Sequence, residues 1–259
     1  MTTRDTAWPA GTPCWVDNMS TNVDAANAFY TDLFGWDIQV GPEETGGYGV
    51  ATKDGKNVAG TMGAPELPHP PVWTTYLATE DTAKTCEAIT AAGGTVLQPA
   101  MDVMDLGVMA VAMDPTGATF GVWQSKAHTG FQLANEPGGV IWNEQLSRDA
   151  DAAKAFYAEV FGYTYGSMGD DESYSMIEVD GNTVGGIGAM PEGIPADVPP
   201  HWRAYFSVED ADAAAEKAAA LGGKVLSAPQ DMPYGRHADI ADPNGAMLAI
   251  LQNPVAPAE

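Results

Sequence analysis

The sequence predicts an α+β protein of two tandem domains, each built from two βαβββ units. The first observation behind this prediction is a repeated phrase: AFYTDLFGW, which begins at Ala28, returns as AFYAEVFGY, which begins at Ala155. The offset of 155 − 28 = 127 residues is close to half of the 259-residue chain. The second observation is that short β-prone segments alternate with two helical segments in each half. We therefore interpret the chain as a duplication.

Other phrases of the first half return in the same order, at offsets from 126 (174 − 48) to 129 (222 − 93) residues. The matching pairs are Trp15–Ser20 and Trp142–Ser147, Tyr48 and Tyr174, Pro70–Trp73 and Pro199–Trp202, Gly93–Leu97 and Gly222–Leu226, and Asp114–Gly117 and Asp242–Gly245. Repeats in this order are not expected by chance. We predict one domain at residues 8–125, a polar linker at 126–137 and a second domain at 138–253.

The first helix of each half carries the repeated aromatic phrase. In the first half, Asn22 and Asp24 indicate where the helix begins, and Gly35 indicates where it ends. Phe29 and Leu33 are four residues apart and therefore share one face of this helix. That spacing favours packing of the helix on a sheet over a cofactor-binding role for the aromatic pair.

The remaining elements of the first half follow from β-prone segments bounded by glycine. A second helix is predicted at Asp81–Ala92, ended by two glycines. The predicted strands are Cys14–Met19, Trp36–Val40, Gly47–Thr52, Val58–Met62, Trp73–Ala78, Thr95–Leu97, Val108–Met113 and Ala118–Gln124. The second half repeats this order.

Composition excludes several classes of partner. Asp and Glu number 35 against 11 Lys and Arg, a net charge of −24 that would repel nucleic acid and anionic membranes. No segment has the roughly 18 consecutive apolar residues of a membrane span, and the first residues lack the apolar core of a signal peptide. We expect a cytoplasmic protein, monomeric or homodimeric, with Cys14 and Cys86 as small hydrophobic residues rather than a disulfide.

These features together resemble the vicinal oxygen chelate superfamily. The features are a β-strand, the Phe-Tyr and Phe-Gly pairs on the following helix, the Asp-Pro-x-Gly phrase before the last strand, and paired βαβββ units. The superfamily includes glyoxalase I, bleomycin-resistance proteins, fosfomycin-resistance enzymes and extradiol dioxygenases, and the tandem arrangement is similar to two-domain actinobacterial proteins labelled glyoxalase-like or hydroxylase. The resemblance implies that each domain is a curled sheet with outer helices, and that the resulting cup holds the ligand.

The resemblance also implies where a metal would bind. Metal-dependent members carry a His on the first strand, a His opening the strand before the second helix, and a Glu on the last strand. The matching positions here are Trp15, Thr74 and Gly121 in the first domain and Trp142, Arg203 and Ala249 in the second. A divalent cation needs three or more converging oxygen, nitrogen or thiolate ligands. We therefore expect no metal and no cofactor; a Glu144 and His237 pair alone would not make a site.

Alternation along the strands predicts which side chains face each cup. The expected residues are Trp15, Asp17, Met19, Thr74, Tyr76, Gly121 and Trp123 in the first domain and Trp142, Glu144, Leu146, Arg203, Tyr205, Ala249 and Leu251 in the second. Large aromatic walls with small residues at the metal positions favour a pocket for a flat or apolar ligand. Aromatic residues at strand spacing equally fit ordinary sheet-face core.

Asp17 and Glu144 are the ionisable groups predicted deep in the two cups. A carboxyl group among indole rings would have a raised pKa and could act as a general acid or base. It could also accept a hydrogen bond from a ligand, or pair with Arg203 in the second domain. Of the histidines, we expect His201 to point away from Arg203, His237 to lie in a loop, and His69 and His128 to have no special role.

Two functions of different class follow. The first is metal-free binding of a hydrophobic or aromatic small molecule, a metabolite or an antibiotic, for resistance, sequestration or a biosynthetic accessory role. The second is a glyoxalase-like carbon–sulfur lyase or isomerase, or an accessory hydroxylase, with Asp17 or Glu144 as acid or base. Because the chemistry of the superfamily generally relies on a metal, the residues at the metal positions favour the first.

Overall fold

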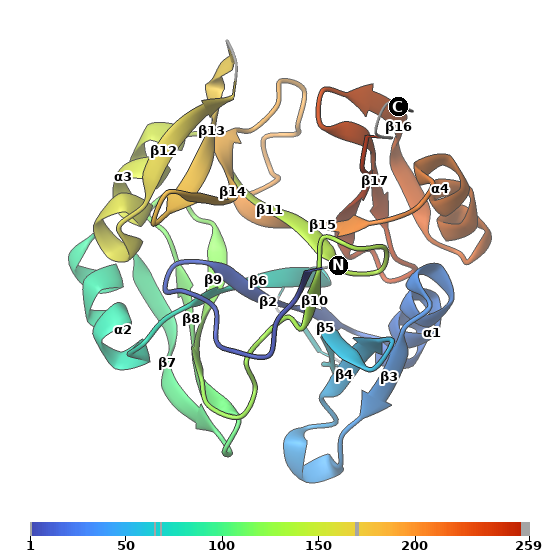
Figure 1. Cartoon of the computed structure of the whole chain (residues 1–259), viewed down its shortest axis with the longest axis horizontal. Helices are drawn as coiled ribbons and strands as arrows, with labels where there is room; N and C mark the ends of the chain where they lie inside the picture. Colours follow the sequence, from blue (N-terminus) through green and yellow to red (C-terminus); the bar gives the residue numbers. More distant parts are fainter. Residues whose placement is uncertain (1, 65, 68, 169–170, 255–259) are drawn as a thin grey trace.

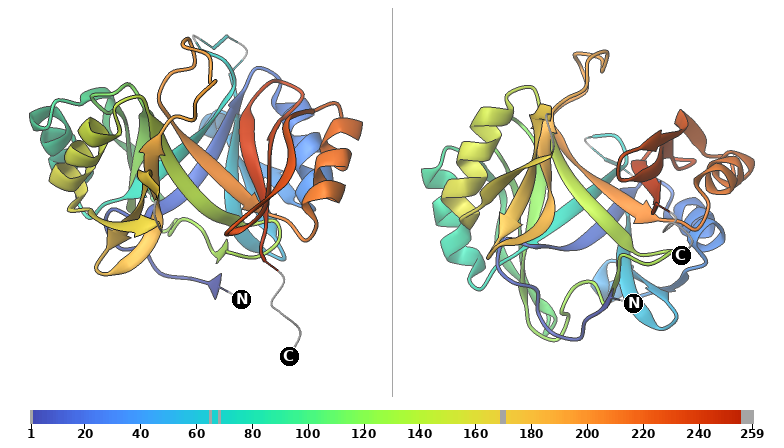
Figure 2. Two further views of the ribbon diagram at one scale, coloured as in Figure 1. Left: turned by 90° about the horizontal axis from the view of Figure 1, so that it is seen from above. Right: turned by 45° about the horizontal axis from the view of Figure 1, so that its top comes forward.

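The computed structural model describes residues 2–64, 66–67, 69–168 and 171–254. It contains two large mixed sheets, packed back to back, with the helices in two pairs at the sides (Figure 1). Helix α1 (Val23–Phe34) lies beside α4 (Ala211–Ala220), and α2 (Thr82–Ala91) lies beside α3 (Ala150–Phe161). Each helix pair therefore joins one helix from each half of the chain, which the two views in Figure 2 also show.

The first sheet has eight strands in the order β3-β4-β5-β2-β6-β9-β8-β7. Its strands are β2 (Pro13–Ser20), β3 (Asp37–Val40), β4 (Gly49–Lys53), β5 (Lys56–Gly63), β6 (Val72–Ala78), β7 (Thr95–Val103), β8 (Gly107–Met113) and β9 (Thr119–Ser125). A short 3₁₀ helix, η1 (Glu43–Thr45), precedes β4.

The second sheet repeats this topology. Its main path is β12-β13-β14-β11-β15-β18-β17-β16, and β10 joins β1 to β11 at one side. Its strands are β1 (Thr2–Thr3), β10 (Leu133–Ala134), β11 (Val140–Ser147), β12 (Thr164–Met168), β13 (Asp171–Val179), β14 (Asn182–Ala189), β15 (His201–Ser207), β16 (Lys224–Met232), β17 (Gly235–Ala241) and β18 (Met247–Gln252).

The pairing of strands shows the two βαβββ units within each domain. In the first domain, β2 pairs with β5 in parallel, as the start and end of one unit, and β6 pairs with β9 in parallel, as the start and end of the next. The two units meet where β2 and β6 run antiparallel. The α+β fold of two tandem domains, each a curled sheet with outer helices, is therefore confirmed. We call the concave faces of the two sheets the first cup and the second cup.

The local signals in the sequence correctly mark the helices. The Asn22 side chain accepts a hydrogen bond from the backbone N–H of Ala25 at the start of α1, and Gly35 follows its end in the left-handed conformation. Strand β7 is longer than predicted, because it continues through Pro99 to Val103. Proline is tolerated there because β7 is an edge strand with one side unpaired.

The repeated aromatic phrase lies at the interface between the two domains. On α1, the Tyr30 hydroxyl donates to Asp242 Oδ2 of the second domain at 3.0 Å and accepts a hydrogen bond from Trp73 Nε1 at 2.9 Å. A Cβ atom added to Gly223 would lie 2.9 Å from the ring of Phe29, so glycine is required for this close approach. The helix prediction is confirmed, and the surface that the helix covers includes the other domain.

The same contacts recur with the domains exchanged. On α3, the Tyr157 hydroxyl donates to Asp114 Oδ2 of the first domain at 3.0 Å and accepts from Trp202 Nε1 at 2.8 Å. Between the two sites, the Thr75 hydroxyl on β6 donates to Asn143 Oδ1 on β11 at 2.9 Å. The repeated phrases of the sequence are thus the parts of two equivalent interdomain networks.

The linker is also structured. Its predicted range, 126–137, contains β10, which pairs with β1 and β11. Phe131 is buried, and its backbone N–H donates to the carbonyl of Cys14 on β2 at 2.8 Å. Within the described part of the chain, every helix is too short or too polar to span a membrane.

We expect Tyr30→Phe to lower the free energy of unfolding by about 1–3 kcal/mol, because it leaves the buried Trp73 N–H without an acceptor and removes a donor from Asp242. Tyr157→Phe should have an effect of the same size. Urea denaturation followed by circular dichroism measures both. Lys84→Ala, which removes an exposed ion pair with Asp81 on α2, is the control and should change stability little. Equal stability of all four proteins would contradict this assignment.

Candidate functional site

In the first cup, one carboxylate is surrounded by aromatic side chains. Asp17 on β2 is 8 % exposed. Its Oδ2 accepts hydrogen bonds from the hydroxyl of Tyr76 at 2.9 Å and from that of Tyr48 at 3.4 Å. The Tyr48 hydroxyl in turn accepts from Trp15 Nε1 at 2.8 Å. Strand alternation places Trp15 and Asp17 on one face of β2, as predicted.

Burial changes the protonation of this carboxylate. Loss of water raises the pKa of Asp17 from its usual 3.8 to about 6, although the hydrogen bonds from Tyr76 and Tyr48 act in the opposite direction. The predicted raised pKa is therefore confirmed for Asp17. The charge of Asp17 has no cationic partner, since no Lys, Arg or His side chain in the described ranges bonds to it.

Gly121 on β9 does not leave open space in the first cup. A Cβ atom at this position would overlap the ring of Tyr76. The small residue is therefore needed because the neighbouring ring lies across it, and the expectation that Gly121 makes room for a ligand is wrong. Trp123 on the same strand is buried, and its Nε1 donates to the backbone carbonyl of His128 at 3.0 Å.

The linker closes one end of the first cup. The His128 ring lies with its centroid 4.5 Å from that of Trp15 and 5.5 Å from that of Trp123, and Phe131 lies 5.7 Å from Trp15. Burial lowers the pKa of His128 to about 4, and its buried Nε2 atom has no hydrogen-bond partner within the described ranges. His128 is therefore part of the wall of this cup, a position that the sequence did not indicate.

The second cup repeats the arrangement around Glu144 on β11. The hydroxyl of Tyr205 donates to Glu144 Oε1 at 2.7 Å and that of Tyr174 donates to Oε2 at 3.0 Å. The Tyr174 hydroxyl accepts from Trp142 Nε1 at 2.9 Å. Tyr205, Ala249 and Leu251 form one cluster with Trp142, separate from the core between the domains.

Arg203 on β15 distinguishes the second cup from the first. Its Nε donates to Glu144 Oε1 at 2.9 Å, its Nη2 bonds to the same oxygen, and its Nη1 donates to Asp239 Oδ1 at 2.9 Å. The guanidinium lies 5.1 Å from the centroid of the Tyr205 ring. Burial tends to lower the pKa of Arg203, but Glu144 and Asp239 together raise it, so the guanidinium stays charged. The alternative that Glu144 pairs with Arg203 is confirmed.

His237 and Asp239 extend this network. His237 lies on β17 rather than in a loop, so that expectation is wrong; its Nε2 is 3.3 Å from Asp239 Oδ1. Burial tends to raise the pKa of Asp239, but the bond with His237 and the charge of Arg203 outweigh it and lower the pKa. His201 was expected to point away from Arg203, which is also wrong: the two are two residues apart on β15 and share a face.

Tyr48 and Tyr174 are site residues that we did not select from the sequence. Each donates a hydrogen bond to the acid of its cup. Tyr48 lies just before β4 and Tyr174 lies on β13, so both are distant in sequence from the strand that carries the acid. Their signal was present, because they match each other in the repeat at an offset of 126 residues (174 − 48). The register of the sheets, which brings them to the acids, could not be read from one sequence.

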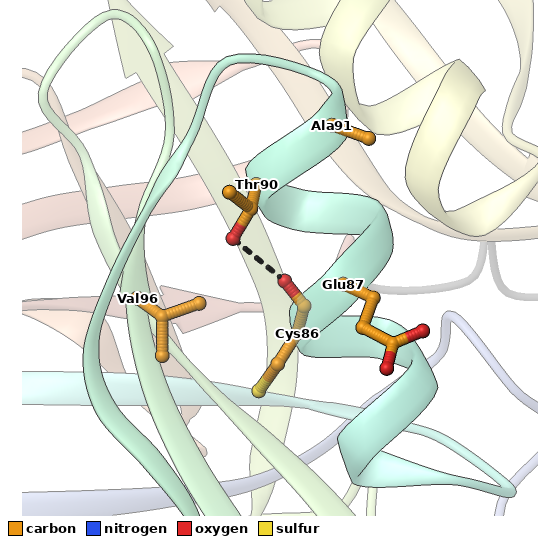
Figure 3. Close-up of a pocket in the computed structure, with 5 residues that line it drawn as sticks. All are labelled: Cys86, Glu87, Thr90, Ala91 and Val96. Carbon is orange, nitrogen blue, oxygen red and sulfur yellow. Dashed lines mark hydrogen bonds between the residues drawn. The ribbon is translucent and has the colours of Figure 1, made fainter.

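A shallow hollow also lies on the outer surface between α2 and β7 (Figure 3). It is lined by Cys86, Glu87, Thr90, Ala91 and Val96. The Thr90 hydroxyl donates to the carbonyl of Cys86 at 3.0 Å. Four of these residues lie on α2 and Val96 lies on β7, and none belongs to either cup.

Comparison with known proteins supports the same fold. Residues 16–122 and 140–250 each match the family described as the Glyoxalase/Bleomycin resistance protein/Dioxygenase superfamily. The chain belongs to this superfamily. Among similar proteins, "Putative glyoxylase CFP32" of Mycobacterium tuberculosis is 44% identical over 93% of this chain and 95% of its own length. "Anthracycline biosynthesis protein DnrV" of Streptomyces peucetius is 35% identical over 95% of each chain.

Solved structures with a similar fold include a glyoxalase and a dioxygenase. The Mn(II)-bound glyoxalase from Novosphingobium aromaticivorans superimposes with a TM-score of 0.65 at 17% identity, covering 94% of this chain and 82% of that one. The 2,3-dioxygenase LapB from Pseudomonas sp. KL28 gives 0.64 at 14% identity, covering 99% and 97%. At these identities the likeness concerns the fold alone.

The side chains at the metal positions of the superfamily do not fit a metal ion. Trp15 and Trp142 present indole N–H groups that donate to tyrosine hydroxyls, and the guanidinium of Arg203 carries the charge that a metal would bring. In the described ranges, no three His, Cys, Asp or Glu side chains are placed to hold a metal ion.

The raised pKa of Asp17 predicts a pH dependence of stability. The pKa of Asp17 in the folded protein, about 6, exceeds the usual 3.8. The contribution of protonated Asp17 to the free energy of unfolding is therefore fully present below about pH 4 and is lost as the pH rises through 6. We therefore expect the free energy of unfolding of wild type to fall by roughly 3 kcal/mol, relative to that of Asp17→Asn, as the pH rises from 4 to 7. Urea denaturation of both proteins at several pH values measures the difference. A difference that does not change with pH would contradict the burial of an ionised Asp17.

Proposed function

We propose that the second cup binds a hydrophobic or aromatic small molecule, a metabolite or an antibiotic, without a metal ion. The observation that carries the proposal is the guanidinium of Arg203, which is held between Glu144 and Asp239 at a position where metal-dependent relatives place a ligand. The positive charge of the site therefore belongs to the protein itself. A ligand there would contact polar groups that Arg203, Glu144 and Asp239 hold in place, which favours binding and orientation over metal-assisted chemistry.

The walls of the second cup support an aromatic ligand. Trp142, Tyr174 and Tyr234 are partly exposed there, around the buried Tyr205. Such rings offer a large flat contact area with a polar edge. In the first cup, Trp15 and Trp123 are both at most 8 % exposed. The second cup is therefore the better candidate for a ligand with several fused rings.

The comparisons favour the same class of ligand. The relative DnrV is named for anthracycline biosynthesis, and anthracyclines are fused aromatic molecules. The aromatic walls and the paired charges of the second cup are consistent with binding such a molecule, either in its biosynthesis or in sequestration.

A panel of anthracyclines, naphthoquinones and simple phenols tests this proposal, with binding followed by calorimetry and tryptophan fluorescence. We expect one class to bind at a ratio of one per chain, and Trp142→Phe to weaken its binding about tenfold through lost stacking area. The matched variant in the first cup is Trp15→Phe, which we expect to leave this affinity within about twofold. The proposal would be contradicted if no compound of the panel bound, or if the two variants changed the affinity equally.

A second candidate function is a glyoxalase-like lyase or isomerase that uses Asp17 as an acid or base. The observation in its favour is the pKa of about 6, which allows proton transfer near neutral pH. The relative CFP32 is named a putative glyoxylase. Glu144 is less suited to this role because Arg203 and two tyrosines hold its carboxylate. Turnover of methylglyoxal with a thiol, with and without added Ni²⁺ or Zn²⁺ and lost in Asp17→Asn, would favour this candidate over binding alone.

A further inference from the structure

We propose that the first cup is a binding site for a small organic cation, an ammonium or amidinium group that pairs with Asp17. The site differs from the second cup, and the proposal does not rest on the function proposed there. It follows from a comparison between the two cups of this one chain.

The two cups share one frame. In each, the acid accepts hydrogen bonds from two tyrosines, and a tryptophan donates to the second of these tyrosines. The strand register makes the positions equivalent: Asp17 pairs with Thr74 as Glu144 pairs with Arg203. Thr74 and Arg203 are therefore the same position in the two cups, with different chemistry.

In the second cup this position supplies a cation. Arg203 bonds to Glu144 and lies over the ring of Tyr205, with its charged carbon 5.1 Å from the ring centroid. The frame thus accommodates a planar cation that touches both the acid and the tyrosine ring. The negative face of an aromatic ring attracts such a cation, in addition to the attraction of the carboxylate.

In the first cup the chain places no cation at this position. Thr74 is short and uncharged, and both tyrosine hydroxyls bond to Oδ2 of Asp17; Oδ1 has no hydrogen-bond partner among the residues that the structure describes. Strand register also identifies the residues equivalent to His237 and Asp239, which are Met109 and Val111. Met109 pairs with Trp123 as His237 pairs with Leu251. Val111 pairs with Gly121 as Asp239 pairs with Ala249. Among the residues that the structure describes, this cup therefore carries a single acid, which matches a ligand with a single positive charge.

A cation from outside would relieve an unfavourable arrangement. A buried charge is costly unless it is paired, and Asp17 is 8 % exposed with no counter-charge in the described part of the chain. Two aromatic residues lie beside this carboxylate: Tyr76 donates to Asp17 directly, and Trp15 donates to Tyr48, which donates to Asp17. The net charge of −24 adds a long-range attraction for cations.

Residues of the linker cover one end of the first cup. His128 and Phe131 cover Trp15 at that end. Met19 and Thr74 face the same cup further along β2 and β6, and both are partly exposed. We infer that a ligand enters from this side, past Thr74, with the linker forming the far wall.

The probe for this proposal is benzamidine, a planar amidinium, with the neutral benzamide as its matched control. Calorimetry at pH 7.5 should show one benzamidine bound per chain at the first cup, and at least tenfold weaker binding of benzamide. Asp17→Asn, whose folding is checked by the urea denaturation described above, should lose at least tenfold in affinity for benzamidine. Equal binding of the two probes, equal binding by the variant, or no binding of benzamidine by wild type would overturn the proposal.

Exchange of the equivalent residues gives a second, independent test. Thr74→Arg should place a guanidinium on Asp17, as Arg203 lies on Glu144, and should abolish benzamidine binding. Because an intramolecular pair replaces an uncompensated charge, Thr74→Arg should also have a higher Tm at pH 7.5 than Thr74→Met, which adds similar bulk without charge. A Thr74→Arg protein that binds benzamidine as wild type does, or that is no more stable than Thr74→Met, would contradict the proposal. The proposal for the second cup is tested with anthracyclines, naphthoquinones and phenols and with Trp142→Phe. A failure of one proposal can therefore be told apart from a failure of the other.

Discussion

Two crossed tyrosine–aspartate hydrogen bonds determine the arrangement of the molecule: Tyr30 to Asp242 and Tyr157 to Asp114. Each tyrosine lies on the first helix of one domain, and each aspartate belongs to the Asp-Pro-x-Gly turn of the other. The aspartates also accept hydrogen bonds from backbone N–H groups of their own turns. Turn, helix and partner domain are thus fixed at one point. The two sheets meet back to back as a result, and both cups face outward.

Much of this fold can be predicted because its signals are local. Helix caps, glycine-bounded strands and the repeat give the elements and their order, and strand alternation places Asp17 and Glu144 in their cups. Other features depend on pairing over long distances. The side chain that fills the space beside Gly121 comes from the neighbouring strand, and the bond from Tyr48 to Asp17 depends on sheet register. The position of His128 against Trp15 depends on the path of the linker. None of these follows from periodicity.

The two cups show how a shared frame can support different chemistry. The acid, the two tyrosines and the tryptophan are present in both, and these groups hold one another in place through hydrogen bonds. The cups differ at three equivalent positions. Strand β6 carries Thr74 where β15 carries Arg203. Strand β8 carries Met109 and Val111 where β17 carries His237 and Asp239. The second cup consequently has a network of paired charges, whereas the acid of the first cup has no counter-charge in the part of the chain that the structure describes. The frame is the stable part of the site, and the charges are its variable part.

The crossed contacts have the pattern of a twofold-symmetric dimer, in which residue i of one subunit touches residue j of the other and j touches i. Here both subunits are parts of one polypeptide. Two identical subunits encoded by one gene must carry identical cups, because every substitution appears twice. A covalently joined pair has no such constraint: an arginine can enter one cup while the other keeps a threonine. The joining of the halves is therefore what permits this molecule to hold two unlike sites within one symmetric body.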